Sequence, residues 1–264
     1  MNPRTIAETK REEEAYWSQV FAEEQRRVDA GNSRPFSSYW WQDYYRSISD
    51  FVDKLFESQT TVSVLEAGCG SGKASILLGE KYETVLMDIS WNALMFAGVL
   101  IRRFTRRRIS PLLGDIFSIP IRPQSFDLSW GIGVIEHYED EHIREIFGQM
   151  IDATKTGGWV GFGVPNFQSL PILKAKLLKL RWFKSIKGYR LGSERSIAVD
   201  KLILMFEGVA RQHAVKVRAC QTTAVGSALP METPEIIVRA FETLLGRLAR
   251  HYRFLNLVLF QIDR

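Results

Sequence analysis

Three glycines at alternating positions follow a short apolar run, and this loop constrains the fold more than any other feature of the chain. Residues 64–72 read Val-Leu-Glu-Ala-Gly-Cys-Gly-Ser-Gly. Because glycine lacks a Cβ, such a loop lets the backbone approach a ligand closely. A dinucleotide fingerprint would need glycine or alanine at position 73, where the chain has Lys73, and a P-loop would need Ser or Thr at position 74, where it has Ala74. The spacing therefore weakens both phosphate-binding interpretations.

Short apolar runs alternate with helical patterns through the middle of the chain. The predicted order is strand 61–66, helix 72–80, strand 84–88, helix 91–104, strands 109–113 and 126–131, helix 139–153 and strand 158–164. The helix at 139–153 carries an apolar stripe that must face the sheet, namely Ile143, Ile146, Phe147, Met150 and Ile151. This alternation predicts a mostly parallel sheet with right-handed crossovers and a ligand beyond its carboxyl edge.

The segments on either side of this alternation are predicted to add helices and two further strands. Residues 4–29 are charged and 36–56 mix aromatic residues with helical spacing, so residues 1–58 are expected to form a helical extension or cap before a domain at 59–264. Past Pro165 we expect an insertion at 167–195, a helix near 198–210, a strand near 214–223, a helix with Thr233 as its N-cap and Pro234 at its first position, and a last strand at 254–260.

Five elements in this order resemble those of class I S-adenosylmethionine-dependent methyltransferases. The glycine loop resembles the turn around the methionine end of the cofactor, and residues 84–88 resemble a strand whose final acid binds the ribose hydroxyls. Residues 111–116 resemble the strand end that meets adenine, 126–137 the fourth strand with the loop beneath the reacting methyl group, and 156–164 the fifth strand. The resemblance implies a doubly wound α/β fold with seven strands, mostly parallel, in which the last strand is antiparallel between strands five and six.

The same resemblance implies S-adenosylmethionine as the cofactor, S-adenosylhomocysteine as its product, and no metal. The residues that it assigns to the cofactor are Glu66, Gly68, Gly70, Gly72, Asp88, Ile89, Asp115, Ile116 and Trp130. Glu66 would organise the glycine turn and meet the amino end of the cofactor. Cys69 and Cys220 have no CxxC neighbour, so free thiols and no structural metal are expected.

Candidates for the acceptor side are less specific. His137 follows the fourth strand, and an imidazole with an ordinary pKa near ~6.5 suits a general base, although the residue could instead only shape its loop. The remaining substrate or lid candidates are Tyr39, Trp40, Tyr44, Tyr138 and Asn166. The aromatic run at 36–45 could cover a sulfonium or cage an apolar acceptor, or Trp40, Tyr44 and Phe51 could simply pack on the sheet.

The net charge of +5 comes largely from two basic clusters. The arginines at 102–108 are expected to form a solvated face at the end of a helix. Residues 171–195 carry eight cations against Glu194, interleaved with Leu170, Leu173 and Leu177 at helical spacing, and this pattern predicts a basic amphipathic lid over the acceptor.

The function predicted from these residues is methyl transfer by in-line displacement to a small metabolite or natural-product acceptor, for which the basic lid suggests anionic or amphipathic character. Positioning would outweigh any single side chain, with general-base help from His137. An RNA methyltransferase is disfavoured, because residues 129–132 read Ser-Trp-Gly-Ile where amino-directed nucleic-acid enzymes carry Asn/Asp-Pro-Pro-Tyr/Phe. A lipid-directed enzyme that touches a membrane through 170–190 and a non-catalytic cofactor-binding protein remain alternatives. Without an apolar run of ~18 residues or an apolar leader, a cytoplasmic location is expected.

Overall fold

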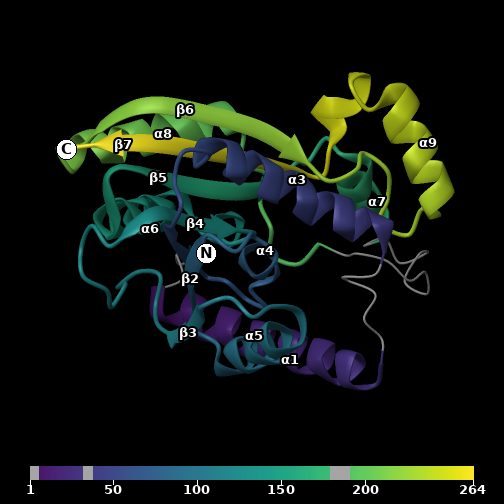
Figure 1. The fold of residues 1–264 in the computed structure, drawn as a ribbon, viewed down its shortest axis with the longest axis horizontal. Helices are drawn as coiled ribbons and strands as arrows, with labels where there is room; N and C mark the ends of the chain where they lie inside the picture. Colours follow the sequence, from purple (N-terminus) through teal and green to yellow (C-terminus); the bar gives the residue numbers. More distant parts are fainter. Residues whose placement is uncertain (1–5, 32–37, 179–190) are drawn as a thin grey trace.

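Seven strands of the described residues, which are 6–31, 38–178 and 191–264, form one sheet in this computed structural model (Figure 1). The strands are β1 (Val62–Ala67), β2 (Tyr82–Asp88), β3 (Ile109–Leu113), β4 (Phe126–Ile132), β5 (Thr154–Pro165), β6 (Lys216–Val225) and β7 (Leu255–Asp263). Their order is β3-β2-β1-β4-β5-β7-β6, with β1 to β5 mutually parallel and β7 antiparallel to both β5 and β6. The predicted doubly wound α/β sheet, with its last strand between the fifth and the sixth, is confirmed.

Helices cover both faces of this sheet (Figure 1). They are α1 (Ile6–Asp29), α3 (Tyr39–Leu55), α4 (Lys73–Ile76), α5 (Trp91–Phe104), η1 (Ile135–His137), α6 (Asp140–Ala153), α7 (Leu170–Leu178), α8 (Val199–Gln212), α9 (Glu235–Leu245) and η3 (Leu248–Tyr252). α6 and α8 share an apolar cluster with β5 and β7 on one face, and α3 and α7 share another with β1 and β4 on the opposite face. The whole predicted stripe of the helix at 139–153 is buried, as expected. None of the described helices has the length and apolar character needed to cross a membrane.

Helices α3 and α5 both begin at serine caps. The Ser38 hydroxyl accepts a hydrogen bond from the Trp41 amide at 3.4 Å and so begins α3, and the Ser90 hydroxyl accepts one from the Ala93 amide at 3.3 Å and begins α5. The cap of α5 follows directly on the carboxyl end of β2. It therefore fixes the direction in which the chain leaves that edge of the sheet.

Arg107 overturns two sequence-based expectations at once. It was expected on a solvated face, but it is buried and its guanidinium donates hydrogen bonds to the carbonyl oxygens of Ser75, Ile76 and Tyr82. Two of these carbonyls lie at the end of α4, where a longer helix would need them as acceptors. The helix predicted at 72–80 accordingly ends at Ile76.

The start of α9 also differs from its prediction by one position. Pro234 has extended backbone angles and serves as the N-cap, so the helix begins at Glu235. The Thr233 amide is engaged by the carbonyl of Pro230 at 3.0 Å, which places Thr233 in the preceding turn rather than at the cap. The predicted capping by the Thr233 side chain is therefore wrong.

Candidate functional site

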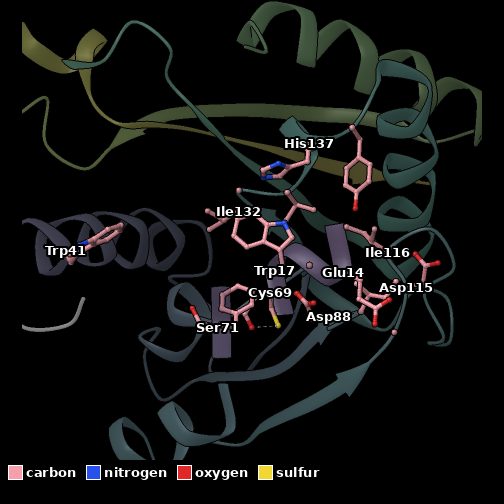
Figure 2. A pocket seen from close by; sticks show the side chains of 18 residues that line it. Glu14, Trp17, Trp41, Cys69, Ser71, Asp88, Asp115, Ile116, Ile132 and His137 are labelled. Atoms are coloured by element: carbon pink, nitrogen blue, oxygen red, sulfur yellow. Dashed lines mark hydrogen bonds between the residues drawn. The ribbon is translucent and has the colours of Figure 1, made fainter. Parts of the chain in front are cut away.

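A cavity of about 340 Å³ lies at the carboxyl ends of the parallel strands (Figure 2). The loops after β1, β2, β3 and β4 form its floor and sides, and residues of α1 form part of its wall. The predicted residues that line it are Gly68, Gly70, Asp88, Ile89, Asp115, Ile116, His137 and Tyr138. The fold therefore gathers at one place most of the side chains that the sequence assigns to a cofactor.

The glycine loop forms a cradle that no other residue type could make without rearrangement. Gly68, Gly70 and Gly72 all have positive φ, at +70°, +53° and +66°. A Cβ on Gly68 would lie 2.9 Å from Val134, one on Gly70 would lie 2.6 Å from the ring of Phe21, and one on Gly72 would clash with Leu86. The backbone at 68–71 is thus held close to the cavity, as a bound cofactor would require.

Asp88 ties this loop to the neighbouring strand. One of its carboxylate oxygens accepts a hydrogen bond from the Gly70 amide at 2.7 Å, and the other accepts one from the Ser90 amide at 2.8 Å. Burial raises the pKa of Asp88, and these backbone hydrogen bonds oppose that shift. Asp115 occupies a similar place after β3, where its carboxylate accepts from the Phe117 amide at 2.9 Å. Both acids lie at the edge of the cavity (Figure 2).

Three of the predicted cofactor residues do not line the cavity. Glu66 lies behind the glycine loop, where its carboxylate accepts from the Ser75 amide at 3.3 Å and burial raises its pKa to about 7. Gly72 caps α4. Trp130 is buried in the core and its indole N–H donates to the Ser75 hydroxyl at 3.1 Å, because alternation along β4 turns this side chain toward the α3 face of the sheet.

His137 faces the cavity from the loop after β4 (Figure 2). Its Nδ1 lies 2.7 Å from the hydroxyl of Ser193, and its ring meets the edge of Trp17 at a centroid distance of 5.4 Å. The segment that carries Ser193 is itself fastened to this loop, since the Arg195 amide donates to the Glu136 carbonyl at 2.9 Å and its guanidinium pairs with Glu139 at 2.7 Å. The ring of His137 is therefore oriented from two sides.

Glu136, next to His137, is a buried carboxyl in the same loop. Its Oε2 has no hydrogen-bond partner within the part of the chain that the structure describes. Burial, with a smaller contribution from Glu194, raises the pKa of Glu136 to about 8. Sequence reasoning placed Glu136 in the loop but gave no reason to expect its burial.

The aromatic cover of the cavity comes from α1, which the sequence prediction missed. Trp17 and Phe21 stack on each other at 5.7 Å and both line the cavity. The helix is fixed there by a hydrogen bond of 2.8 Å between the Ser18 and Ser90 hydroxyls and by an ion pair of 2.9 Å between Glu24 and Lys73. Trp17 and Phe21, four positions apart in a helix rich in charged residues, were the signal that could have identified this face.

The aromatic residues of α3 mostly serve the core instead. Trp40 and Tyr44 are buried against the sheet, and the Trp40 indole donates to the Leu229 carbonyl at 2.9 Å. Tyr39 lies under the guanidinium of Arg239 at 4.1 Å. None of these three lines the cavity, whereas Trp41, on the next face of the helix, does. Trp40 and Tyr44 therefore pack on the sheet, while contact of the aromatic run with a ligand, through Trp41, stays a prediction.

Asn166 is also structural. Its side-chain amide donates to the carbonyls of His251 and Arg253 at 2.7 and 2.9 Å, which joins the end of β5 to the chain before β7. Asn166 is not among the residues that line the cavity.

The predicted lid at 167–195 is described only in part, because residues 179–190 lie outside the described ranges. Its described helix, α7, does not line the cavity. The expected apolar stripe faces solvent, since Leu170, Leu173 and Leu177 are exposed while Pro171, Ile172, Ala175 and Leu178 are buried. Among the described elements, α1 rather than α7 covers the cavity.

The two cysteines are free thiols, as predicted. Within the described ranges there is no group of three or more His, Cys, Asp or Glu side chains able to hold a metal ion.

Comparison with known proteins finds a family model that matches the central segment. A family model described as a methyltransferase domain matches residues 64–158. Two curated relatives are both malonyl-[acyl-carrier protein] O-methyltransferases. The relative from a Methylovorus species is 31% identical over 122 residues, which cover 43% of this chain and 40% of that protein. The one from Salmonella typhimurium is 30% identical over 127 residues, 48% of each chain. The match spans less than half the length of either relative.

Solved structures resemble this chain over nearly its whole length. Magnesium protoporphyrin IX methyltransferase from Synechocystis, with bound S-adenosylhomocysteine, has a TM-score of 0.61 at 12% identity and covers 97% of this chain and 100% of its own. The N-methyltransferase NodS from Bradyrhizobium japonicum, in complex with the same compound, has a TM-score of 0.56 at 16% identity, with coverages of 94% and 99%. At these identities the likeness establishes the fold.

Proposed function

We propose that this chain, whose residues 64–158 match a methyltransferase domain, is a class I methyltransferase that binds S-adenosylmethionine in the cavity and transfers its methyl group to a small-molecule acceptor. The observation that carries the proposal is the joint presence of the glycine cradle, Asp88 and Asp115 at the carboxyl edge of the sheet. A cofactor with a ribose and an adenine needs a close backbone approach and acids at the ends of neighbouring strands. These residues fit that requirement.

Each part of the cavity then has a distinct role in holding the cofactor. The backbone at 68–71 would hold the methionine end, Asp88 the ribose hydroxyls, and Asp115 with Ile116 the adenine. Glu66 would act through the loop, because its carboxylate holds the start of α4. Trp17 and Phe21 would exclude water from above.

In methyl transfer the main task of the protein is to position the acceptor against the methyl group of the cofactor. Bound S-adenosylmethionine supplies a methyl group on a positively charged sulfur, which makes that carbon an electrophile. Correct placement of an acceptor contributes roughly 7–11 kcal/mol to such a transfer, while a general base adds about 10²–10⁴-fold. His137 is positioned for the second role, since Ser193 and Trp17 orient its ring at the cavity wall. The Ser193 hydroxyl can either donate to Nδ1 or accept from it, so the contact fits both tautomers of His137. The role of general base requires the tautomer that carries its proton on Nδ1, because Nε2 can then take the proton of the acceptor.

The described lining favours an acceptor with an apolar body. The lining includes the apolar and aromatic residues Trp17, Trp41, Ile132 and Tyr138, and no lysine or arginine lines the described cavity. The expectation of an anionic acceptor therefore depends on residues 179–190, which lie outside the described ranges. We further propose that residues 1–58 form a cap on the domain, which the position of α1 at the cavity supports. A cytoplasmic location is also part of this proposal.

The experiment that tests this function measures release of S-adenosylhomocysteine from S-adenosylmethionine in the presence of grouped acceptors. Carboxylic acids, amines, phenols and thiols form the small-molecule arms, and malonyl-carrier protein, RNA and lipid vesicles form three separate arms. We expect turnover in at least one small-molecule arm. Turnover confined to RNA or vesicles would contradict the proposed acceptor class. Cofactor binding without turnover in any arm would favour the non-catalytic alternative.

A further inference from the structure

Helix α9 turns its apolar face toward solvent. The helix and η3 project beyond the end of the sheet (Figure 1), and several of their aliphatic side chains are exposed, with Ile236 at 77%, Leu244 at 78% and Leu248 at 77%. Ile236, Ile237 and Leu244 lie within about 100° of one another around α9, Leu245 borders this arc, and Leu248 follows on η3. Val238 is the buried residue of α9. We call these five exposed residues the α9 apolar face.

Polar contacts hold the helix in this orientation. Glu242, from the side opposite the α9 apolar face, accepts a hydrogen bond from the Ser227 hydroxyl at 2.8 Å and pairs with Arg253 at 3.1 Å. Arg239 lies over the ring of Tyr39 on α3 at 4.1 Å. An amphipathic helix of a monomeric protein normally buries its apolar stripe and exposes its polar one. Here the polar side is anchored to the body of the protein, which leaves the apolar side for a partner.

The charges around this face are positive. Each acid of the α9 region is held by a cation, with Glu232 paired to Lys174 of α7 at 2.5 Å, Glu235 to Arg239 and Glu242 to Arg253. Three exposed cations, Lys176, Arg247 and Arg250, have no ion-pair partner among the described residues. The surplus charge of Arg247 and Arg250 beside the apolar face therefore favours an anionic occupant.

We propose that the α9 apolar face, with the flanking Arg247 and Arg250, docks on the surface of an anionic lipid bilayer. A projecting helix with aliphatic residues on one side and cations beside them has the pattern of a helix that lies in the membrane interface. The exposed Tyr252 suits the boundary between the two, because its ring is apolar and its hydroxyl is polar. Two copies of this face carry the same surplus of positive charge, so repulsion opposes their association, whereas an anionic bilayer attracts the face.

Vesicle sedimentation of the full chain tests this proposal without requiring methyl transfer. The probes are vesicles of phosphatidylcholine alone and vesicles containing phosphatidylglycerol. We expect binding to the second kind that weakens with salt. The double change Leu244→Glu and Leu248→Glu should reduce that binding at least about tenfold, because it removes apolar area and adds negative charge. Arg247→Gln with Arg250→Gln should reduce binding to anionic vesicles and flatten the salt dependence.

Leu204→Glu is the matched control, since Leu204 is 68% exposed on α8, away from α9 (Figure 1). It should bind vesicles like the wild type, and unchanged thermal unfolding of all variants shows that the chain still folds. Equal loss of binding in Leu204→Glu and in the Leu244/Leu248 variant would overturn the assignment to α9. Absence of binding to any vesicle would overturn the proposal. The chain could instead bind no vesicle but self-associate or bind an acidic protein. If the α9 changes abolished that association, the membrane proposal would be overturned in favour of a protein partner.

Discussion

At the scale of single residues, Asp88 carries the most testable part of the site. Its carboxylate holds the glycine loop and faces the cavity at the same time. Asp88→Ala should weaken the binding of S-adenosylhomocysteine by about 1.5–3 kcal/mol, the range for a hydrogen bond to a charged group. Titration calorimetry measures the change. Glu83→Ala, an exposed change on the same strand, is the control and should leave affinity unchanged. Equal affinities of the two variants would remove Asp88 from the site.

Substitution of His137 distinguishes a role in proton transfer from a role in loop structure. If the imidazole takes the proton of the acceptor, His137→Ala should lower kcat by about 10²–10⁴-fold with little change in cofactor affinity. Ser193→Ala should cost less and shift the pH–rate profile, because only the orienting hydrogen bond is lost. Steady-state kinetics across pH provide the measurement. An unchanged kcat in the alanine variant would mean that His137 only shapes the loop.

Glu136 predicts a pH dependence of stability. Burial raises its pKa from 4.5 to about 8, so between these values the folded chain holds a proton that the unfolded chain has released. Its contribution to stability is therefore full below about pH 4.5 and is lost as the pH rises toward 8. Glu136→Gln carries no titrating group at this position. The quantity to measure is the urea midpoint of the wild type minus the urea midpoint of the variant. This difference should decrease as the pH is raised from about 5 to about 8.

Glu141→Gln, at an exposed position on α6, is the control for this measurement and should follow the wild type at every pH. A difference between wild type and Glu136→Gln that stays constant with pH would show that Glu136 does not titrate in this interval.

At the scale of elements, α1 should act as part of the binding site rather than as a separate extension. Its Phe21 packs on Gly70 and its Trp17 meets His137, so the helix touches both ends of the cavity. Phe21→Ala should lower affinity for S-adenosylhomocysteine roughly threefold to tenfold, as the loss of an aromatic contact of about 0.5–1.5 kcal/mol implies. Calorimetry again measures it. Gln19→Ala, on the exposed side of α1, should have no effect, and the same result for Phe21→Ala would contradict this role.

Elements that depend on local pattern were predictable, and those that depend on distant contacts were not. The bounds of α5 and β3 match the sequence prediction, because a serine cap and a short apolar run define them locally. The end of α4 depends on Arg107, about 31 residues away, and the cover of the cavity depends on α1, whose Phe21 reaches a glycine 49 positions later. The pattern of residues 72–80 does not encode the contact with Arg107, and the spacing of Trp17 and Phe21 marks a face of α1 without showing what that face covers.

The same distinction explains the candidate site. Gly68, Gly70, Asp88 and Asp115 could be placed because each follows a strand of a parallel sheet, and the carboxyl ends of such strands meet at one edge. The orientation of Trp130, Trp40 and Tyr44 depended instead on which face of a strand or helix turns inward. Aromatic composition does not determine that choice, and all three belong to the core.

At the scale of the whole molecule, the cavity and the α9 apolar face lie at different parts of the fold (Figure 1, Figure 2). The cavity is built from the loops after four strands with α1, whereas α9 and η3 project from the chain between β6 and β7. Cofactor binding and surface docking should therefore respond to different substitutions. The variants of Leu244 and Leu248 should bind S-adenosylhomocysteine like the wild type, and Asp88→Ala should bind vesicles like the wild type.

The central claim is that the glycine cradle, Asp88 and Asp115 bind S-adenosylmethionine. Titration calorimetry of the folded full chain with S-adenosylhomocysteine, and separately with NAD, tests it most directly. The account predicts one molecule of S-adenosylhomocysteine bound per chain and little affinity for NAD, since Lys73 stands where a dinucleotide fingerprint needs glycine or alanine. Tight binding of NAD together with no binding of S-adenosylhomocysteine would contradict it.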